Sequence, residues 1–124
     1  SLEENICLCS FVQQAVVYGL NRPYNICIVV PDFEVLLSYA KEKGLPTDIK
    51  TLVERQDIKD IISEAVTNQL KGKFGGYEIP KKFIILPEAF SLDNGMLTQT
   101  MKLKRKVVLD KLNDRIEALY KEDK

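Results

Sequence analysis

Histidine and tryptophan are absent from this 124-residue chain, and cysteine occurs only three times. Without histidine, the chain cannot form a Ser-His or Cys-His catalytic pair by itself, and a zinc site would need an unusual ligand set. No Cys-x-x-Cys motif is present either. We therefore expect no metal site and no histidine-dependent nucleophilic catalysis within this chain.

The three cysteines lie among apolar residues. Cys7 and Cys9 alternate with Ile6 and Leu8, and Cys27 lies inside an apolar run, so the pattern predicts small hydrophobic side chains packed in strands. Unpaired, packed thiols are typical of a reducing compartment, on the cytoplasmic side of membranes.

The chain has no excess of charge and no long apolar run. Lys and Arg number 18, as do Asp and Glu, so any basic patch must be local, and a nucleic-acid partner is not expected. The longest apolar run, residues 26–31, is far below the roughly 20 residues that cross a bilayer, and no signal-peptide pattern opens the chain. A hydrophobic fraction of 45% is ordinary for one globular domain with one core.

Strand patterns occur in three places. Segments 11–20 and 24–31 are rich in Val, Ile and Tyr and are joined by Asn-Arg-Pro, which predicts a hairpin. A polar, glycine-rich segment, 72–82, is not expected to be regular, and it leads into a third strand at 83–86.

Helical patterns fill most of the remaining sequence. The expected helices are 32–43 with Asp32 as cap and Gly44 after its end, a short one capped by Thr47 or Asp48, one over 57–70 followed by Gly72, and a last one from Lys106. The fold class is therefore α+β, a small domain with a central sheet of about three strands flanked by helices. We expect these apolar residues to be buried together: Ile26, Ile28, Val30, Ile62, Val66, Ile84 and Leu112.

A cationic stretch, "LDNGMLTQTMKLKR", occupies residues 92–105. Asn94-Gly95 is a strong turn dipeptide, so the chain is expected to reverse just before the lysines. If the segment is extended, one face carries four polar residues, namely Thr98, Thr100, Lys102 and Lys104. Such a face is either a solvated edge strand protected against aggregation or a surface that reaches a phosphate or carboxylate.

The longer segment "FIILPEAFSLDNGMLTQTMKLKR", residues 83–105, resembles the C-terminal signature of long-chain acyl-CoA synthetases, the long-chain fatty acid:CoA ligase branch of the adenylate-forming (AMP-binding) superfamily. Upstream, residues 11–19 and 26–44 resemble the small domain of the same family, so the resemblance covers nearly the whole chain. The signature positions present here, in order, are Leu86-Pro87-Glu88, Phe90-Ser91, Asn94-Gly95, Leu97-Thr98, Thr100, Lys102 and Lys104-Arg105.

This resemblance implies that residues 1–124 are the C-terminal lid domain of a longer enzyme with a large N-terminal adenylation domain. That enzyme would join a fatty carboxylate to ATP, with Mg²⁺, to give an acyl adenylate and pyrophosphate, and coenzyme A would then displace AMP. Lys102 holds the position of the family's adenylation lysine, which reaches the large domain's active site in the first step. The resemblance also implies that the lid rotates between the two half-reactions.

The resemblance assigns lesser roles to neighbouring residues. Thr98, Thr100, Lys104 and Arg105 would support substrate or nucleotide binding, and Asn94 with Gly95 would position the loop. No ATP, Mg²⁺ or coenzyme A is expected to bind stably to this domain alone, and the isolated domain is expected to be inactive. Association of the full-length enzyme with the endoplasmic reticulum or other membranes stays open.

The chain departs from the family pattern at a few places. Gln99 stands where family members often have Pro, and Met101 where the wider superfamily has Gly. The opening "SLEENI" resembles the stretch just after the family's hinge and its glycine-containing coenzyme A loop, which implies that this is one domain of a longer enzyme. The alternative is a stand-alone α+β interaction module whose basic hairpin binds an acidic partner, where no single lysine would be essential.

Overall fold

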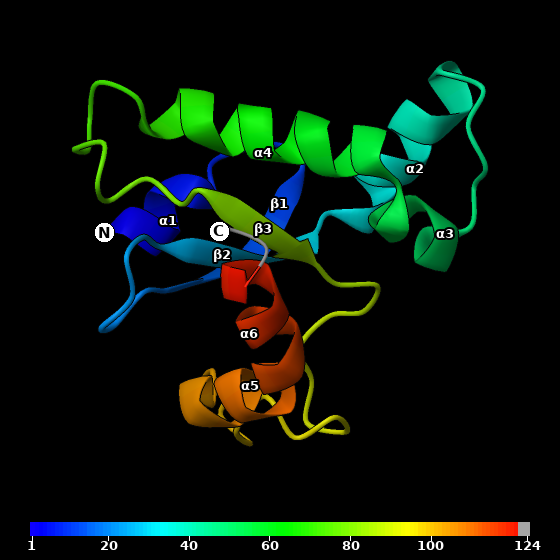
Figure 1. The fold of residues 1–124 in the computed structure, drawn as a ribbon. Helices are drawn as coiled ribbons and strands as arrows, with labels where there is room; N and C mark the ends of the chain where they lie inside the picture. Colours follow the sequence, from blue (N-terminus) through cyan, green and yellow to red (C-terminus); the bar gives the residue numbers. More distant parts are fainter. Residues whose placement is uncertain (122–124) are drawn as a thin grey trace. The chain divides into compact units, whose positions relative to one another are not determined.

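The computed structural model describes residues 1–121 and divides into two compact units, Ser1–Pro87 and Glu88–Lys124. Each unit is described by itself below (Figure 1). The first contains α1 (Leu2–Ile6), β1 (Val12–Tyr18), β2 (Ile26–Pro31), α2 (Phe33–Glu42), α3 (Ile49–Glu54), α4 (Gln56–Leu70) and β3 (Lys82–Ile85). The second contains α5 (Arg105–Lys111) and α6 (Asn113–Lys121).

The first unit is built on a three-stranded mixed sheet in the order β1-β2-β3. β1 and β2 form the antiparallel hairpin that the sequence predicts, and β3 lies parallel to β2, with Ile28 opposite Ile84. A parallel pair needs a long crossover, and α2, α3 and α4 provide it. The α+β fold class and the three strands are therefore confirmed.

Local capping chemistry explains where the crossover helices begin and end. Asp32 accepts a hydrogen bond of 3.2 Å from the Val35 amide at the start of α2, and Gly44 follows its end with φ of +70°. Asp48 caps α3 through the Thr51 amide at 3.2 Å. These contacts confirm the predicted helix after Pro31 and select Asp48 over Thr47 as the second cap.

The core of the first unit lies between the sheet and α4. Ile62 and Val66 of α4 pack in one cluster with Cys27, Val29 and Ile85 of the sheet. The prediction had also placed Ile26, Ile28, Val30 and Ile84 in that cluster. They are buried, but alternation along the strands puts them on the opposite face of the sheet. Since β2 is buried along its whole length, both of its faces are apolar.

The N-terminal segment corrects another prediction. Residues 2–6 form α1, and Cys7 is the C-terminal cap of this helix instead of a strand residue. Ser1 accepts a hydrogen bond from the Glu4 amide while the Glu4 side chain bonds back to the cap, which is a capping box. Cys9 is buried after the turn that follows, and Cys27 lies in β2 as predicted.

The second unit ends in two short helices where one was expected. The helical pattern from Lys106 onward is present, but Leu112, with φ of −99° and ψ of 8°, separates α5 from α6. Val108 and Ile116 are buried, whereas Leu112 is only half-buried, contrary to the prediction. Across residues 1–121, none of the helices has the length and apolar composition that crossing a membrane requires.

Candidate functional site

The candidate site occupies two successive turns in the second unit, and Asn94 organises the first. Its side-chain oxygen accepts hydrogen bonds from the amides of Ser91 at 3.0 Å and Met96 at 3.1 Å. Its side-chain nitrogen donates to the Ala89 carbonyl at 2.9 Å. The Ser91 hydroxyl accepts in return from the Asn94 amide at 3.1 Å, so one asparagine fixes the chain reversal from both sides.

Gly95 and Lys111 complete this first turn. Gly95 has φ of +79°, a left-handed conformation that favours glycine. The Lys111 ammonium, from α5, donates a hydrogen bond to the Asn94 carbonyl and lies 3.6 Å from where a Cβ on Gly95 would be. Lys111 therefore ties α5 to the turn, a contact that sequence reasoning missed because 17 residues separate the partners.

The lysine-bearing segment is a tight hairpin, not an extended strand. Leu97 and Leu103 form an isolated antiparallel bridge, and the Thr98 amide donates to the Lys102 carbonyl at 2.8 Å. The Met101 amide donates to the Thr98 carbonyl at 2.8 Å, and Met101 itself has φ of +64°. A three-residue loop whose last residue is left-handed is a common way to close a hairpin. Alternation in an extended segment therefore does not describe these residues.

The two predicted threonines meet within this hairpin. Their hydroxyl oxygens are 3.0 Å apart, and the Thr98 hydroxyl also accepts the Lys102 amide at 3.1 Å. Lys104 leaves the loop, because its amide donates to the Met96 carbonyl at 2.8 Å and α5 begins at the next residue, Arg105. The structure thus brings Thr98, Thr100 and Lys102 together and places Lys104 and Arg105 at the start of a helix.

The Lys102 side chain is exposed, while its backbone amide and carbonyl are both hydrogen-bonded to Thr98 across the hairpin. Within residues 1–121, its ammonium has no hydrogen bond or ion pair. The backbone that carries the side chain is therefore fixed, while the ammonium, on its flexible stem, is available to a group from outside this unit.

The chemistry of the loop suits an anion. Cations and hydroxyls recognise phosphate or carboxylate oxygens, whereas Mg²⁺ takes oxygen ligands such as carboxylates and waters. Among the described residues, no three His, Cys, Asp or Glu side chains gather in a way that could hold a metal ion. This loop can therefore contribute charge to a Mg²⁺-nucleotide complex, but not a ligand set for the metal.

The matches to curated proteins cover most of this chain. Fatty acyl-CoA synthetase B of Dictyostelium discoideum is 36% identical over 112 residues, which are 89% of this chain and 17% of that protein. Human long-chain-fatty-acid–CoA ligase 1 is 37% identical over 113 residues, 88% of this chain and 16% of that protein. The chain thus spans about a sixth of the length of these relatives. No family model matches it.

Solved structures agree on the fold. The adenylation domain of a carboxylate reductase from Mycobacterium chelonae superposes with a TM-score of 0.77 at 30% identity, over 96% of this chain and 17% of that one. The corresponding domain from Segniliparus rugosus, in complex with AMP and a co-purified carboxylic acid, gives 0.76 at 26% identity, over 98% and 17%.

Proposed function

We propose that this chain, which is homologous to long-chain fatty acid–CoA ligases and has the fold of the C-terminal domain of adenylate-forming enzymes, supplies Lys102 to acyl adenylate formation. The full-length enzyme would activate a long-chain fatty acid with ATP and pass it to coenzyme A. The observation that carries this proposal is the exposed Lys102 ammonium on a hairpin whose backbone is fixed.

In the first half-reaction, the fatty carboxylate oxygen attacks the α-phosphorus of ATP. A carbon–oxygen–phosphorus linkage forms, the bond to the β-phosphate oxygen breaks, and Mg²⁺-bound pyrophosphate leaves. Both reactants are anions, and negative charge grows on the phosphoryl oxygens in the transition state. An ammonium placed there offsets the repulsion and stabilises that charge without any proton transfer.

In the second half-reaction, the coenzyme A sulfur attacks the acyl carbonyl, AMP leaves, and the thiol proton is released. Lys102 is not needed for this step, because the bond between the acyl group and the phosphate has already formed and AMP is now the leaving group. We propose that the lid rotates relative to the large N-terminal domain between the steps and takes Lys102 out of the site.

The neighbouring residues have supporting roles in this proposal. Thr98 holds the Lys102 amide, and the Thr100 hydroxyl lies beside it, so the pair shapes the loop. Asn94 and Gly95 set the entry of the hairpin. Lys104 and Arg105 add positive charge near the start of α5 without sharing the loop.

The test compares Lys102→Ala with Lys104→Ala in the full-length protein. Loss of one preorganised charge should slow adenylation, measured as ATP-pyrophosphate exchange, by about two to three orders of magnitude. Thioester formation from pre-made acyl adenylate should be nearly unchanged. Lys104→Ala should cost much less, and Lys102→Arg should not restore the rate, since a planar guanidinium does not replace a point charge.

Equal losses at the two positions, or equal losses in the two half-reactions, would remove Lys102 from the catalytic role. An anion-binding module would instead show small and salt-sensitive losses at Lys102, Lys104 and Lys106 alike. The 124-residue chain alone should show no exchange, because the nucleotide and acyl sites would lie on the large domain.

A further inference from the structure

Two loops of the first unit meet at one end of its sheet. The β1–β2 loop, residues 19–25, and the α4–β3 loop, residues 71–81, enter the parallel strands β2 and β3 side by side, with Ile26 opposite Lys82. Asn25 joins them: its side-chain nitrogen donates to the Glu78 carbonyl at 3.0 Å, and its carbonyl accepts the Lys81 amide at 2.8 Å. Figure 1 shows both loops extending from the end of the unit where α1 lies. We call residues 19–25 and 71–82 the loop end.

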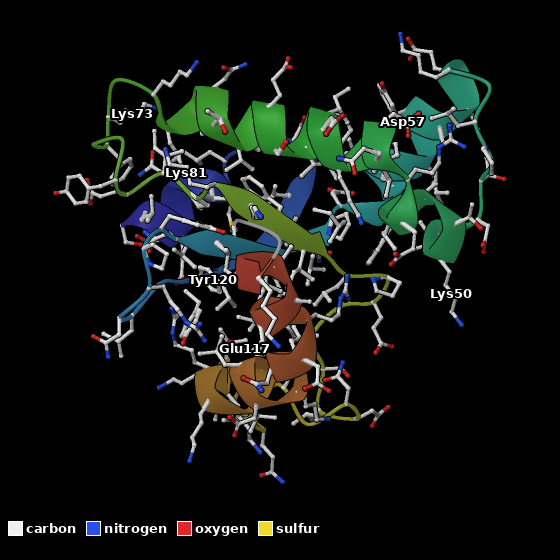
Figure 2. The ribbon with its side chains drawn as sticks, in the orientation of Figure 1. Lys50, Asp57, Lys73, Lys81, Glu117 and Tyr120 are labelled. Carbon is white, nitrogen blue, oxygen red and sulfur yellow. The ribbon has the colours of Figure 1, made fainter. Side chains whose placement is uncertain are left out.

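Charge at the loop end is strongly one-sided, although the chain as a whole is neutral. Its only carboxylate, Glu78, turns into its own loop, where its side chain accepts the Gly75 amide at 3.0 Å. Lys73 and Lys81 are exposed, and Figure 2 shows both at this end of the unit. The cations of the loop end are Arg22, Lys71, Lys73, Lys81 and Lys82.

The carboxylates of the adjacent helix α1 are already engaged. Glu3 accepts the Val17 amide at 2.6 Å, and Glu4 pairs with the amino terminus at 3.0 Å. These contacts leave both carboxylates negatively charged, so α1 offsets part of the positive charge, and five cations of the loop end still face three carboxylates.

Each of the two loops also exposes one large side chain. Leu20 is 76% exposed and Tyr77 is 83% exposed, the two highest values among the exposed large hydrophobic side chains of residues 1–121. The Tyr77 ring lies beside Gly75, where an added Cβ would come 2.8 Å from it. Tyrosine suits the headgroup level of a bilayer, where its ring is half apolar and its hydroxyl stays wet.

We propose that the loop end docks on a membrane surface that contains anionic phospholipids. The cations match the negative surface, each contributing while it stays within a Debye length of it. Leu20 and Tyr77 distinguish a bilayer from a soluble anion, because a soluble phosphate would engage the cations and leave these two side chains in water. This docking is independent of the adenylation role, since it uses neither Lys102 nor its hairpin.

The test measures co-sedimentation of the 124-residue chain with vesicles of phosphatidylcholine, alone or with one third phosphatidylserine. Binding should require phosphatidylserine and weaken with salt. The double variant Lys73→Gln, Lys81→Gln should lower the partition coefficient about 25-fold, because it removes the usual contribution of a lysine near such a surface twice. The matched control is Lys41→Gln with Lys50→Gln, also exposed; Lys50 lies at the opposite end of the unit in Figure 2. It should change binding by less than about twofold, since its charges face away from the membrane.

A second pair of variants tests the apolar contribution. Leu20→Ser with Tyr77→Ser should lower the partition coefficient about tenfold while leaving the salt dependence in place. Equal effects of the two lysine pairs, or equal binding to both vesicle types, would overturn the proposal. So would full binding by the Leu20→Ser, Tyr77→Ser variant together with displacement by polyglutamate, which would indicate an acidic protein as the partner. All six positions are exposed, and thermal unfolding of each variant checks that the fold is kept.

Discussion

Met101→Gly should stabilise the hairpin that carries Lys102. Met101 has φ of +64°, and its side chain is 63% exposed, so the substitution relieves a left-handed conformation with little loss of buried area. A side chain in that conformation costs about 1–2 kcal/mol. Glycine also gives the unfolded chain more conformational freedom, which takes away about 0.5–1 kcal/mol of this gain. The closed hairpin should therefore gain about 0.5–1 kcal/mol.

Amide hydrogen exchange measures this gain where it arises. The amides of Thr98, residue 101 and Lys102 donate to hydrogen bonds that exist only while the hairpin is closed. Their exchange should slow about two- to fivefold in Met101→Gly, the rate equivalent of the expected gain. Amides of β2, in the other unit, should be unchanged.

Met101→Ala is the matched control, because it removes the same side chain and keeps the left-handed penalty. It should give no protection. If alanine protects as well as glycine, or if glycine speeds exchange, the strain does not lie in the backbone at position 101.

Two further predictions concern the turn and the buried thiols. Asn94→Ala removes three side-chain hydrogen bonds and should destabilise the second unit by about 3 kcal/mol. Asn94→Asp keeps the acceptor for the amides of Ser91 and Met96 but sets a carboxylate oxygen against the Ala89 carbonyl, so it should cost about 2 kcal/mol, more than one lost bond and less than alanine. Urea titration followed by exchange at residues 91 and 96 checks this, and equal losses would contradict it. Burial raises the pKa of the Cys27 thiol, which is 0% exposed, and so lowers its thiolate fraction at any given pH. Iodoacetamide should therefore modify half-buried Cys7 well before Cys27 in the native chain, and at an equal rate in guanidinium. Fast labelling of Cys27 in the native chain would refute its assigned place in β2.

Local chemistry in the sequence was enough to predict most elements of the first unit. Asp32, Gly44 and Asp48 end or begin helices through contacts with residues no more than four positions away, and such contacts can be read from a linear sequence. The N-terminal error shows competition between two local signals. Alternation of Ile6 to Cys9 suggested a strand, but the capping box of Ser1 and Glu4 starts a helix that Ile6 ends.

The core assignment needed information that the sequence does not contain. All six residues of β2 are buried, so alternation gives no sign of which residues face α4. Pairing with β3 and packing against Ile62 and Val66 decide the matter in favour of Cys27 and Val29. A fully buried strand therefore predicts burial correctly and its facing residues poorly.

The candidate site shows the same difference between local contacts, which the sequence predicts, and contacts that depend on the folded chain. Asn94-Gly95 predicted a turn, because both residues act through their own backbone neighbourhood. A hairpin was expected in this stretch with its turn at Asn94-Gly95, but the second turn at 98–102 was not anticipated, since a methionine in a left-handed conformation has no signal in the sequence. The contact from Lys111 to the Asn94 carbonyl depends on the folded position of α5 and could not be found by spacing.

The construction of the hairpin also bears on which residue should be essential. A lysine paired with a carboxylate of its own unit would have to break that pair before it could reach a phosphate. Lys102 is instead positioned through its amide and carbonyl, which bond to Thr98, so its ammonium keeps its full capacity for a ligand. Residues that hold the backbone should therefore affect the rate through loop geometry, and conservative changes at Thr98 should be tolerated if the hydroxyl remains. In the proposed mechanism only Lys102 brings its charge to the phosphate, so we expect that Lys104 and Arg105, which lie at the start of α5, do not compensate for its removal.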